Sequence, residues 1–196
     1  MLKSLLVERF KLKTHTETKE MPVYALIVAR SDGKLGSDLK PSTSDCSNQA
    51  ELQKRMEALS KEGPAAMAKA MRGPAIPCTV MPAMGATPGN FGMRGNGQPM
   101  TTLMQLLTQA TGRTVVDKTG LTGLYDWELH FDPEVMLRMA AQAGVNIPAG
   151  AAANLPPSES PALLTALQEQ LGLKLDSQRG PVEILAIDSV EAPTAD

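Results

Sequence analysis

One pattern constrains the fold of this chain more than any other: an amphipathic helix, an extended strand, a short turn and a second strand follow one another three times. The copies begin at Leu5, Leu106 and Ala166 and read LLVERFKLKTHTETKEMPVYALIVAR, LLTQATGRTVVDKTGLTGLYDWELHF and ALQEQLGLKLDSQRGPVEILAIDSV. Moving the first copy by 101 positions places Tyr24 on Tyr125 without a gap. The spacing is irregular, which indicates duplicated units within one domain rather than a solenoid of fixed period. The alternative interpretation is that any helix followed by a hairpin produces such a pattern.

This pattern predicts an α+β fold in which helix-plus-hairpin units pack into a small antiparallel or mixed sheet covered by helices. Residues 1–30, 100–142 and 161–196 are predicted to form the three units, all within one domain. Residues 31–99 are predicted to be an irregular insertion with short helices and a loop rich in Gly, Pro and Met, and residues 143–160 a linker. Long insertions often carry binding contacts, so these two segments are where we expect a partner surface.

Start and stop signals bound the helices. The first helix carries a leucine stripe that ends at Phe10. Gly112 and Gly172 are natural stops for the helices of the second and third units. The candidate N-terminal caps are Thr101 or Thr102, Ser160 before Pro161, and Asp132 before an additional helix over residues 133–142.

The strands are predicted to follow each helix stop. The first strands are expected at 114–118 and 174–177 and the return strands at 124–131 and 182–190, with TGLTG and RGP as the turns. Within 124–131, apolar residues alternate with polar ones, which predicts one face in the core and one in water. The stretch PAMGATPGNFGMRGNGQP is dense in Gly, Pro and Asn and is predicted to be a loop or irregular extended chain.

Composition excludes several classes of protein. The 196 residues include only six aromatic residues but 31 Gly or Pro, so the core must consist mainly of aliphatic side chains and Met. A net charge of -2 and the lack of a basic stripe argue against a nucleic-acid partner. No stretch approaches the roughly 20 apolar residues that cross a bilayer.

The N-terminal segment does not fit a signal peptide, because Glu8 and Arg9 interrupt its apolar run. Its first helix begins at the initiator Met without a cap, from which we expect that the natural chain begins further upstream.

The two cysteines, Cys46 and Cys78, lie in the least regular part of the chain. A disulfide between them would contribute about 3 to 4 kcal/mol in the chain-entropy estimate. An even count in loop-rich sequence fits an oxidising compartment, but two free cysteines are equally ordinary in a cytosolic protein. The residues alone leave the choice open.

Three segments together resemble a known but uncharacterised family. The segments are LLVERFKLKTHTETKEMPVYALIVAR, GRTVVDKTGLTGLYDWELHFDPE and LLTALQEQLGLKLDSQRGPVEILAIDSVEAPT, and VVDKTGLTGLYDWEL is the most specific part. The family is a soil-associated domain of unknown function that is expanded in acidobacteria and planctomycetes and is sometimes fused to membrane peptidases of the beta-lactam-sensor type. Its members begin further upstream with a secretion signal and another hairpin-containing segment. The resemblance implies a periplasmic or extracellular protein, favours a Cys46–Cys78 disulfide, and implies no activity.

The sequence offers one candidate surface site. Asp126, Glu128 and His130 share the polar face of the strand at 124–131, in a pattern that a weak divalent-metal or carbohydrate site could use. The simpler interpretation is a solvated strand face. The chain has no GxSxG elbow, HExxH helix or Walker loop, and His15 and His130 are each expected to face solvent on a strand. We therefore assign no catalytic, cofactor or metal-binding residue.

Two hypotheses for function remain. The first is an extracytoplasmic binding or protein-interaction module of a soil-bacterial envelope protein, which engages an envelope protein or peptide through a strand edge or through the insertions. The second is a hydrolase or metal-dependent enzyme that uses the face formed by Asp126, Glu128 and His130. Convergence of that face with polar groups from another unit would favour the enzyme, and scattered exposure would favour the module.

Overall fold

The computed structural model describes residues 2–47, 49–85, 89–148, 150 and 160–192, and the fold is α+β. The chain divides into two compact units. Unit 1 consists of residues Met1–Val23 and Ser177–Asp196, and unit 2 of Tyr24–Asp176. None of the described helices is long and apolar enough to span a membrane.

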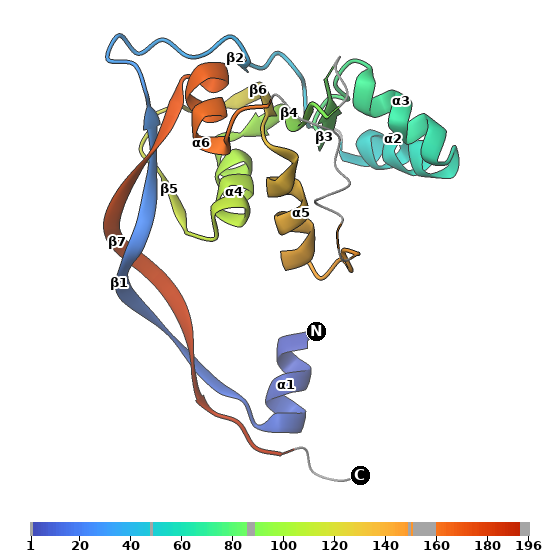
Figure 1. The fold of residues 1–196 in the computed structure, drawn as a ribbon. Helices are drawn as coiled ribbons and strands as arrows, with labels where there is room; N and C mark the ends of the chain where they lie inside the picture. The colour runs from blue at the N-terminus through green and yellow to red at the C-terminus, as the bar shows by residue number, and fades with distance from the viewer. Residues whose placement is uncertain (1, 48, 86–88, 149, 151–159, 193–196) are drawn as a thin grey trace. The chain divides into compact units, whose positions relative to one another are not determined.

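Unit 2 is built around a four-stranded antiparallel sheet (Figure 1). Its strands are β2 (Leu39–Pro41), β3 (Val80–Met84), β4 (Phe91–Pro99) and β6 (Leu124–His130), in the order β2-β6-β4-β3. The alternation predicted for 124–131 is confirmed, since Tyr125, Trp127, Leu129 and Phe131 are all buried. The side chains between them occupy the opposite face of the sheet.

Helices cover the apolar face of this sheet. They are α4 (Met100–Thr111), α5 (Pro133–Gln142), and α6 (Leu163–Ala166), which continues as the π-helical turn η2 (Leu167–Leu171). One hydrophobic cluster joins the leucines of α4, α6 and η2 to the aromatic residues of β6. Leu103, Leu107, Leu167 and Leu171 are each fully buried within it. As expected from the composition, the core is mostly aliphatic.

A second helical pair lies between β2 and β3 in the sequence. Helices α2 (Gln49–Lys61) and α3 (Pro64–Arg72) confirm the short helices expected in the 31–99 segment. However, the stretch after them, predicted to be a loop or irregular extended chain, is regular: β3 and β4 form an antiparallel ladder there. The glycines allow close strand packing: a Cβ on Gly92 would collide with the Leu129 carbonyl oxygen, and a Cβ on Gly95 would collide with the Trp127 indole.

Unit 1 contains the helix α1 (Leu2–Phe10) and a two-stranded ribbon. The ribbon is formed by residues 13–23 of β1 (Lys13–Val28) and residues 177–189 of β7 (Leu173–Ser189), which run in opposite directions (Figure 1). The end of the ribbon next to α1 is tied by a backbone hydrogen bond from the Glu191 amide to the Phe10 carbonyl, 2.8 Å long, and by a contact of 2.7 Å between the His15 Nδ1 atom and the Asp188 carboxylate. In unit 2, Tyr24–Leu26 of β1 pair in parallel with β5 (Val115–Asp117).

The three predicted hairpins are not observed. In the first and third of the predicted helix-plus-hairpin repeats, β1 and β7 are each one continuous strand through the predicted turn. In the second predicted repeat, β5 and β6 belong to different sheets. The physical reason is that β1 and β7 pair with each other, and this long-range ladder outweighs the local turn preference of residues such as Gly180 and Pro181.

The predicted C-terminal ends of the helices agree with the structure better than the predicted N-terminal caps. Gly112 and Gly172 end their helices in the left-handed conformation, with φ of 69° and 68°. Asp132 caps α5 by accepting a hydrogen bond from the Glu134 amide. The predictions of caps at Thr101, Thr102 and Ser160 are wrong: Pro99 and Ala162 occupy the N-cap positions, and neither start has a side-chain cap.

Candidate functional site

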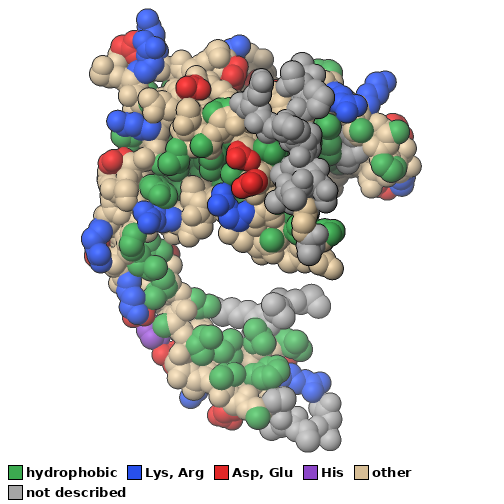
Figure 2. Space-filling view, viewed as in Figure 1, with side chains coloured by type: hydrophobic (Ala, Val, Ile, Leu, Met, Phe, Trp, Pro, Cys, Tyr) green, Lys and Arg blue, Asp and Glu red, His purple; other side chains and the backbone are tan. Residues whose placement is uncertain are grey.

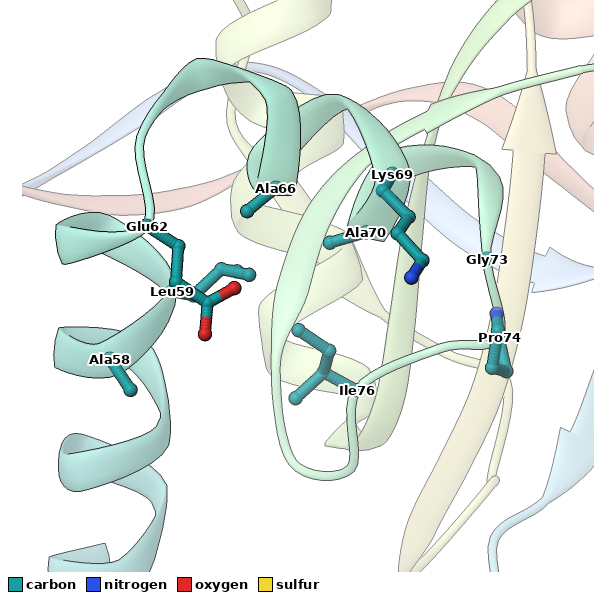
Figure 3. A pocket seen from close by; sticks show the side chains of 9 residues that line it. All are labelled: Ala58, Leu59, Glu62, Ala66, Lys69, Ala70, Gly73, Pro74 and Ile76. Atoms are coloured by element: carbon teal, nitrogen blue, oxygen red, sulfur yellow. The ribbon is translucent and has the colours of Figure 1, made fainter.

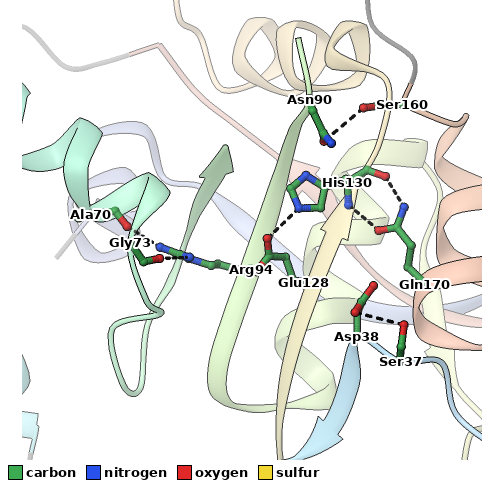
Figure 4. Close-up of polar contacts among 10 residues, drawn as sticks. All are labelled: Ser37, Asp38, Ala70, Gly73, Asn90, Arg94, Glu128, His130, Ser160 and Gln170. Atoms are coloured by element: carbon green, nitrogen blue, oxygen red, sulfur yellow. Dashed lines mark hydrogen bonds and ion pairs between the residues drawn. The ribbon is translucent and has the colours of Figure 1, made fainter. Parts of the chain in front are cut away.

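The three predicted site residues lie on the polar face of β6, and two of them are in direct contact. The Nε2 atom of His130 lies 2.7 Å from a Glu128 carboxylate oxygen (Figure 4). Asp126 is engaged elsewhere, because its carboxylate accepts a hydrogen bond of 2.8 Å from the Gly97 amide. The strand period therefore places them on one face, and only Glu128 and His130 form a pair.

His130 is fixed from both sides. Its backbone N–H donates to the Gln170 side-chain oxygen and its carbonyl accepts from the Gln170 amide, at 2.7 and 2.8 Å (Figure 4). The expectation that His130 faces solvent is wrong, because its side chain is mostly buried against β4; the Nδ1 atom is buried and has no hydrogen-bond partner in the described part of the chain. It packs against Gly92, where a Cβ would approach it to 3.0 Å. A general base must reach the proton that it removes, and here one ring nitrogen is occupied and the other is enclosed.

A hollow of about 210 Å³ lies beside this pair on the same face. Asp126 and Glu128 line it together with Asp38 and Lys40 from the β2 region, and with Arg94 and Asn96 from β4. These residues thus come both from the segment predicted to be an insertion, 31–99, and from the second predicted helix-plus-hairpin repeat, 100–142. No group of three metal-ligating side chains occurs among the described residues. The hollow has mixed charge, with carboxylates opposite a lysine and a buried arginine.

Arg94 is the residue on this face that sequence analysis missed. Its side chain is only 6% exposed, and its guanidinium donates to the carbonyl oxygens of Ala70 and Gly73 at the end of α3 (Figure 4). A cation at the C-terminal end of a helix satisfies free carbonyls and complements the helix dipole. The surrounding GMRGNGQP sequence indicated only a flexible loop, so nothing local marked Arg94 as buried.

The two cysteines form a disulfide next to this face. Cys46 and Cys78 are joined with their Cα atoms 5.5 Å apart. Asn96 supports the link, because its side-chain oxygen accepts hydrogen bonds from Ser44 and from the Cys78 amide. Gly97 adopts φ of 62° at a register shift in β4, and a Cβ there would lie 2.5 Å from the Cys46 sulfur. The bulge in β4 therefore makes room for the disulfide.

A separate apolar pocket of about 350 Å³ lies between α2 and α3 (Figure 3). Its walls are mainly Ala side chains with Leu59 and Ile76, and Glu62 and Lys69 add one charge of each sign. Ile76 is buried at its base. The pocket lies in the predicted insertion, but no unsatisfied polar group marks it for a particular ligand among the described residues.

The most exposed apolar surface belongs to the ribbon of unit 1. Leu185 and Ile187 on β7 are 62% and 65% exposed, and Val190, just beyond the strand, is similarly exposed. Hydrophobic side chains gather along the ribbon and around α1 in the space-filling view (Figure 2). β7 is also the last strand in its sheet, so one of its edges pairs with no strand in the described structure. The surface thus combines apolar side chains with free backbone groups.

Comparison with known proteins adds a family but no activity. A family model described as "Protein of unknown function (DUF3738)" matches residues 1–190. The chain belongs to this family. No curated protein and no solved structure matches it. The DUF3738 match runs from α1 through β7, so both the polar face of β6 and the open ribbon lie within the family region.

Proposed function

We propose that this DUF3738 chain is an extracytoplasmic protein-interaction module of a soil-bacterial envelope protein, and that it binds an extended segment of its partner at the open edge of β7. One observation carries the proposal. β7 is an edge strand whose exposed side chains include Leu185 and Ile187. Soluble proteins usually protect such an edge with charges, proline or a covering segment.

Strand addition fits this surface physically. An incoming strand would pair with the backbone N–H and C=O groups on the outer edge of residues 182–187, and these main-chain hydrogen bonds provide affinity with little dependence on sequence. Specificity would come from side chains that alternate along the edge. Leu185 and Ile187 are two residues apart, so they project from the same face and can contact one apolar stripe of the partner.

The disulfide and the family resemblance support the proposed compartment. Structural disulfides persist in oxidising environments such as the periplasm and the extracellular space. The Cys46–Cys78 bond joins two segments 32 residues apart and is built into the β4 bulge. The soil-associated family that the chain resembles is exported, which supports the same location.

The test is site-specific crosslinking of the full-length natural protein in its own envelope. A photo-reactive residue at position 185 should capture a defined partner, whereas one at Leu164, which is exposed on α6 of unit 2, should not. The captured partner should then be purified and added to the protein. Strand addition predicts slower amide hydrogen exchange at residues 182–187 and unchanged exchange in α4.

A second result would contradict the proposal. Recovery of no partner, together with turnover of a substrate that is lost in Glu128→Gln or His130→Ala, would instead support the enzyme hypothesis. The geometry gives that hypothesis less support, because the His130 nitrogens are either paired with Glu128 or enclosed beside Gly92. Asp126 is likewise engaged by the Gly97 amide.

A further inference from the structure

The hollow on the polar face of the four-stranded sheet has a buried hydrogen-bond donor in its wall. Arg94 lines this hollow and is only 6% exposed. Its terminal nitrogens donate to the Ala70 and Gly73 carbonyl oxygens, whereas its Nε atom has no hydrogen-bond partner among the described residues. The Trp127 Nε1 atom also lacks a partner, but that side chain packs in the hydrophobic cluster on the opposite face. Because a buried N–H group is costly to leave unpaired, the Arg94 Nε atom favours an acceptor placed in the hollow.

Five charged side chains line the hollow, in two rows across the sheet. In the first row the Glu128 amide donates to the Asp38 carbonyl, and Glu128 pairs with Arg94 on its other side (Figure 4). In the second row Lys40 pairs with Asp126. Residues that lie directly opposite one another in an antiparallel sheet project from the same face. The two cations therefore occupy opposite corners of the hollow, and carboxylates lie between them.

The carboxylates of the hollow can accept further hydrogen bonds. One oxygen of each is already engaged, and the partners are His130 for Glu128, the Gly97 amide for Asp126 and the Ser37 hydroxyl for Asp38. An ionised carboxylate offers about four lone-pair positions, so each of the three retains acceptor capacity. The hollow thus presents unused acceptors beside an unused donor.

The arrangement of charges selects the class of ligand. An anion would pair with Lys40 and Arg94 but would also meet three carboxylates. A cation would pair with the carboxylates and leave the Arg94 Nε–H group without an acceptor. An amino-acid zwitterion needs one positive and one negative side, which cations at opposite corners do not provide. A hydroxyl group both donates and accepts, so a ligand with several hydroxyl groups matches every position.

We propose that this hollow binds a neutral polyhydroxylated ligand, a single sugar unit. One hydroxyl oxygen accepts from the Arg94 Nε–H group, and neighbouring hydroxyls donate to Glu128 and Asp126. The volume of about 210 Å³ is smaller than the sites of drug-sized ligands, which begin at about 300 Å³, and this limits the occupant to one ring. The Ala70 and Gly73 carbonyls hold the guanidinium in place, so the donor is positioned before the ligand arrives.

The inference goes beyond the proposed function, because it concerns a different surface. The hollow belongs to unit 2, whereas residues 182–187 of β7 belong to unit 1. Sugar binding in the hollow and strand addition at the β7 edge are therefore tested independently, and failure of one leaves the other standing.

The test is NMR titration of the purified full chain, labelled with a heavy nitrogen isotope. The probes are D-glucose, D-galactose and D-xylose, and the readout is the nitrogen–proton cross-peak of the Arg94 Nε–H group. At least one sugar should shift this cross-peak in a saturable way, with a dissociation constant on the order of 1 mM, as expected for so small a ligand. Sodium phosphate, magnesium chloride and glycine are titrated at matched ionic strength to represent the three excluded classes.

Two substitutions test the hydrogen bonds while leaving the buried arginine in place. Lys40→Met removes an exposed donor, and Glu128→Gln keeps the size of the side chain but exchanges an acceptor oxygen for an amide donor. Each should raise the dissociation constant for the sugar about three- to tenfold, the effect of one lost hydrogen bond. Lys61→Met is the matched control, because this exposed lysine of α2 does not line the hollow, and it should leave the dissociation constant unchanged. Backbone spectra that match the wild type away from the hollow verify that each variant is folded.

Each outcome decides the inference. A saturable response of Arg94 to a sugar, weakened in Lys40→Met and Glu128→Gln but not in Lys61→Met, supports it. A stronger response to phosphate, magnesium or glycine than to any sugar overturns the class of ligand. A sugar response that does not saturate, or that both hollow variants leave unchanged, overturns the site. No response of Arg94 to any probe overturns the inference as a whole, and an ordered water is then the acceptor for the Nε–H group.

Discussion

Gly95 lies directly opposite Trp127 across the β4–β6 ladder, with no room for a side chain between them. A Cβ on Gly95 would come within 2.5 Å of the indole ring. Trp127 is buried in the main hydrophobic cluster, so the ring has little freedom to move away. The pair fixes how closely β4 packs on the core of unit 2.

We therefore predict that Gly95→Ala destabilises unit 2 by about 1 to 3 kcal/mol, the usual range for overpacking a core. Denaturant unfolding followed by Trp127 fluorescence measures the loss. Gly180→Ala is the control, because its Cβ would meet a single side-chain atom of Val23 at 3.2 Å. A midpoint for Gly95→Ala equal to that of the control would contradict the close packing of Gly95 and Trp127.

Arg94 provides the second prediction. Replacing it by Met keeps most of the buried volume but removes the donors that hold the Ala70 and Gly73 carbonyls. A hydrogen bond from a charged group contributes about 1.5 to 3 kcal/mol, so the free energy of unfolding should fall by about 2 to 4 kcal/mol. Amide exchange should rise in α3. Arg72→Met, at an exposed position of the same helix, should change stability by less than about 0.5 kcal/mol.

Reduction of the Cys46–Cys78 bond tests how much this disulfide contributes to the stability of the folded chain. Opening this loop should cost about 3 to 4 kcal/mol, because the unfolded chain gains conformational freedom. Chemical denaturation with and without reductant measures the difference. The double variant Cys46→Ser, Cys78→Ser should show the lower stability in both conditions. If reductant shifts the variant as well, the effect does not come from this disulfide.

The turn after β1 gives a pH prediction. The Arg30 guanidinium donates two hydrogen bonds to the Asp32 carboxylate, at 2.8 and 3.0 Å, and together with the Lys34 amide it lowers the pKa of Asp32 to about 2. A carboxyl whose pKa is lowered on folding stabilises the folded state above its ordinary pKa, near 4, and this contribution is lost as pH falls towards 2.

NMR titration of the Asp32 carboxyl carbon measures that pKa directly. In Arg30→Gln the guanidinium is gone, so the pKa of Asp32 should rise towards its ordinary value, with the Lys34 amide still lowering it somewhat. Lys34→Gln serves as the comparison, since the Lys34 ammonium lies 3.9 Å from the carboxylate and should matter less. An unchanged pKa in Arg30→Gln would show that the arginine is not the cause.

The parts of the fold that sequence analysis predicted correctly depend on local rules. The α5 helix needs only Asp132 and Pro133 at its start, and both act within one turn. The period of two in β6 likewise places Tyr125 and Trp127 in the core whatever strand pairs beside them. Such signals survive because long-range contacts agree with them.

The errors come from pairing that no local window contains. Gly180 and Pro181 have the composition of a turn, yet they lie inside β7, which pairs with β1. The candidate site shows the same limit. The period placed Asp126 and Glu128 together, but Asp38 and Arg94 join them only through the β2-β6-β4 pairing. Strand order across a long insertion cannot be read from the periodicity of one segment.

The Cys46–Cys78 bond fixes the points where the chain enters and leaves the α2–α3 segment. Because the ends of this segment are covalently held, a change of length or sequence within it need not displace β2 and β3, provided that the Ala70 and Gly73 carbonyls still accept hydrogen bonds from Arg94. The α2–α3 segment is thus an insertion whose two ends are held together by a disulfide. An engineer can therefore vary α2 and keep the end of α3, whose Ala70 and Gly73 carbonyls hold the buried Arg94.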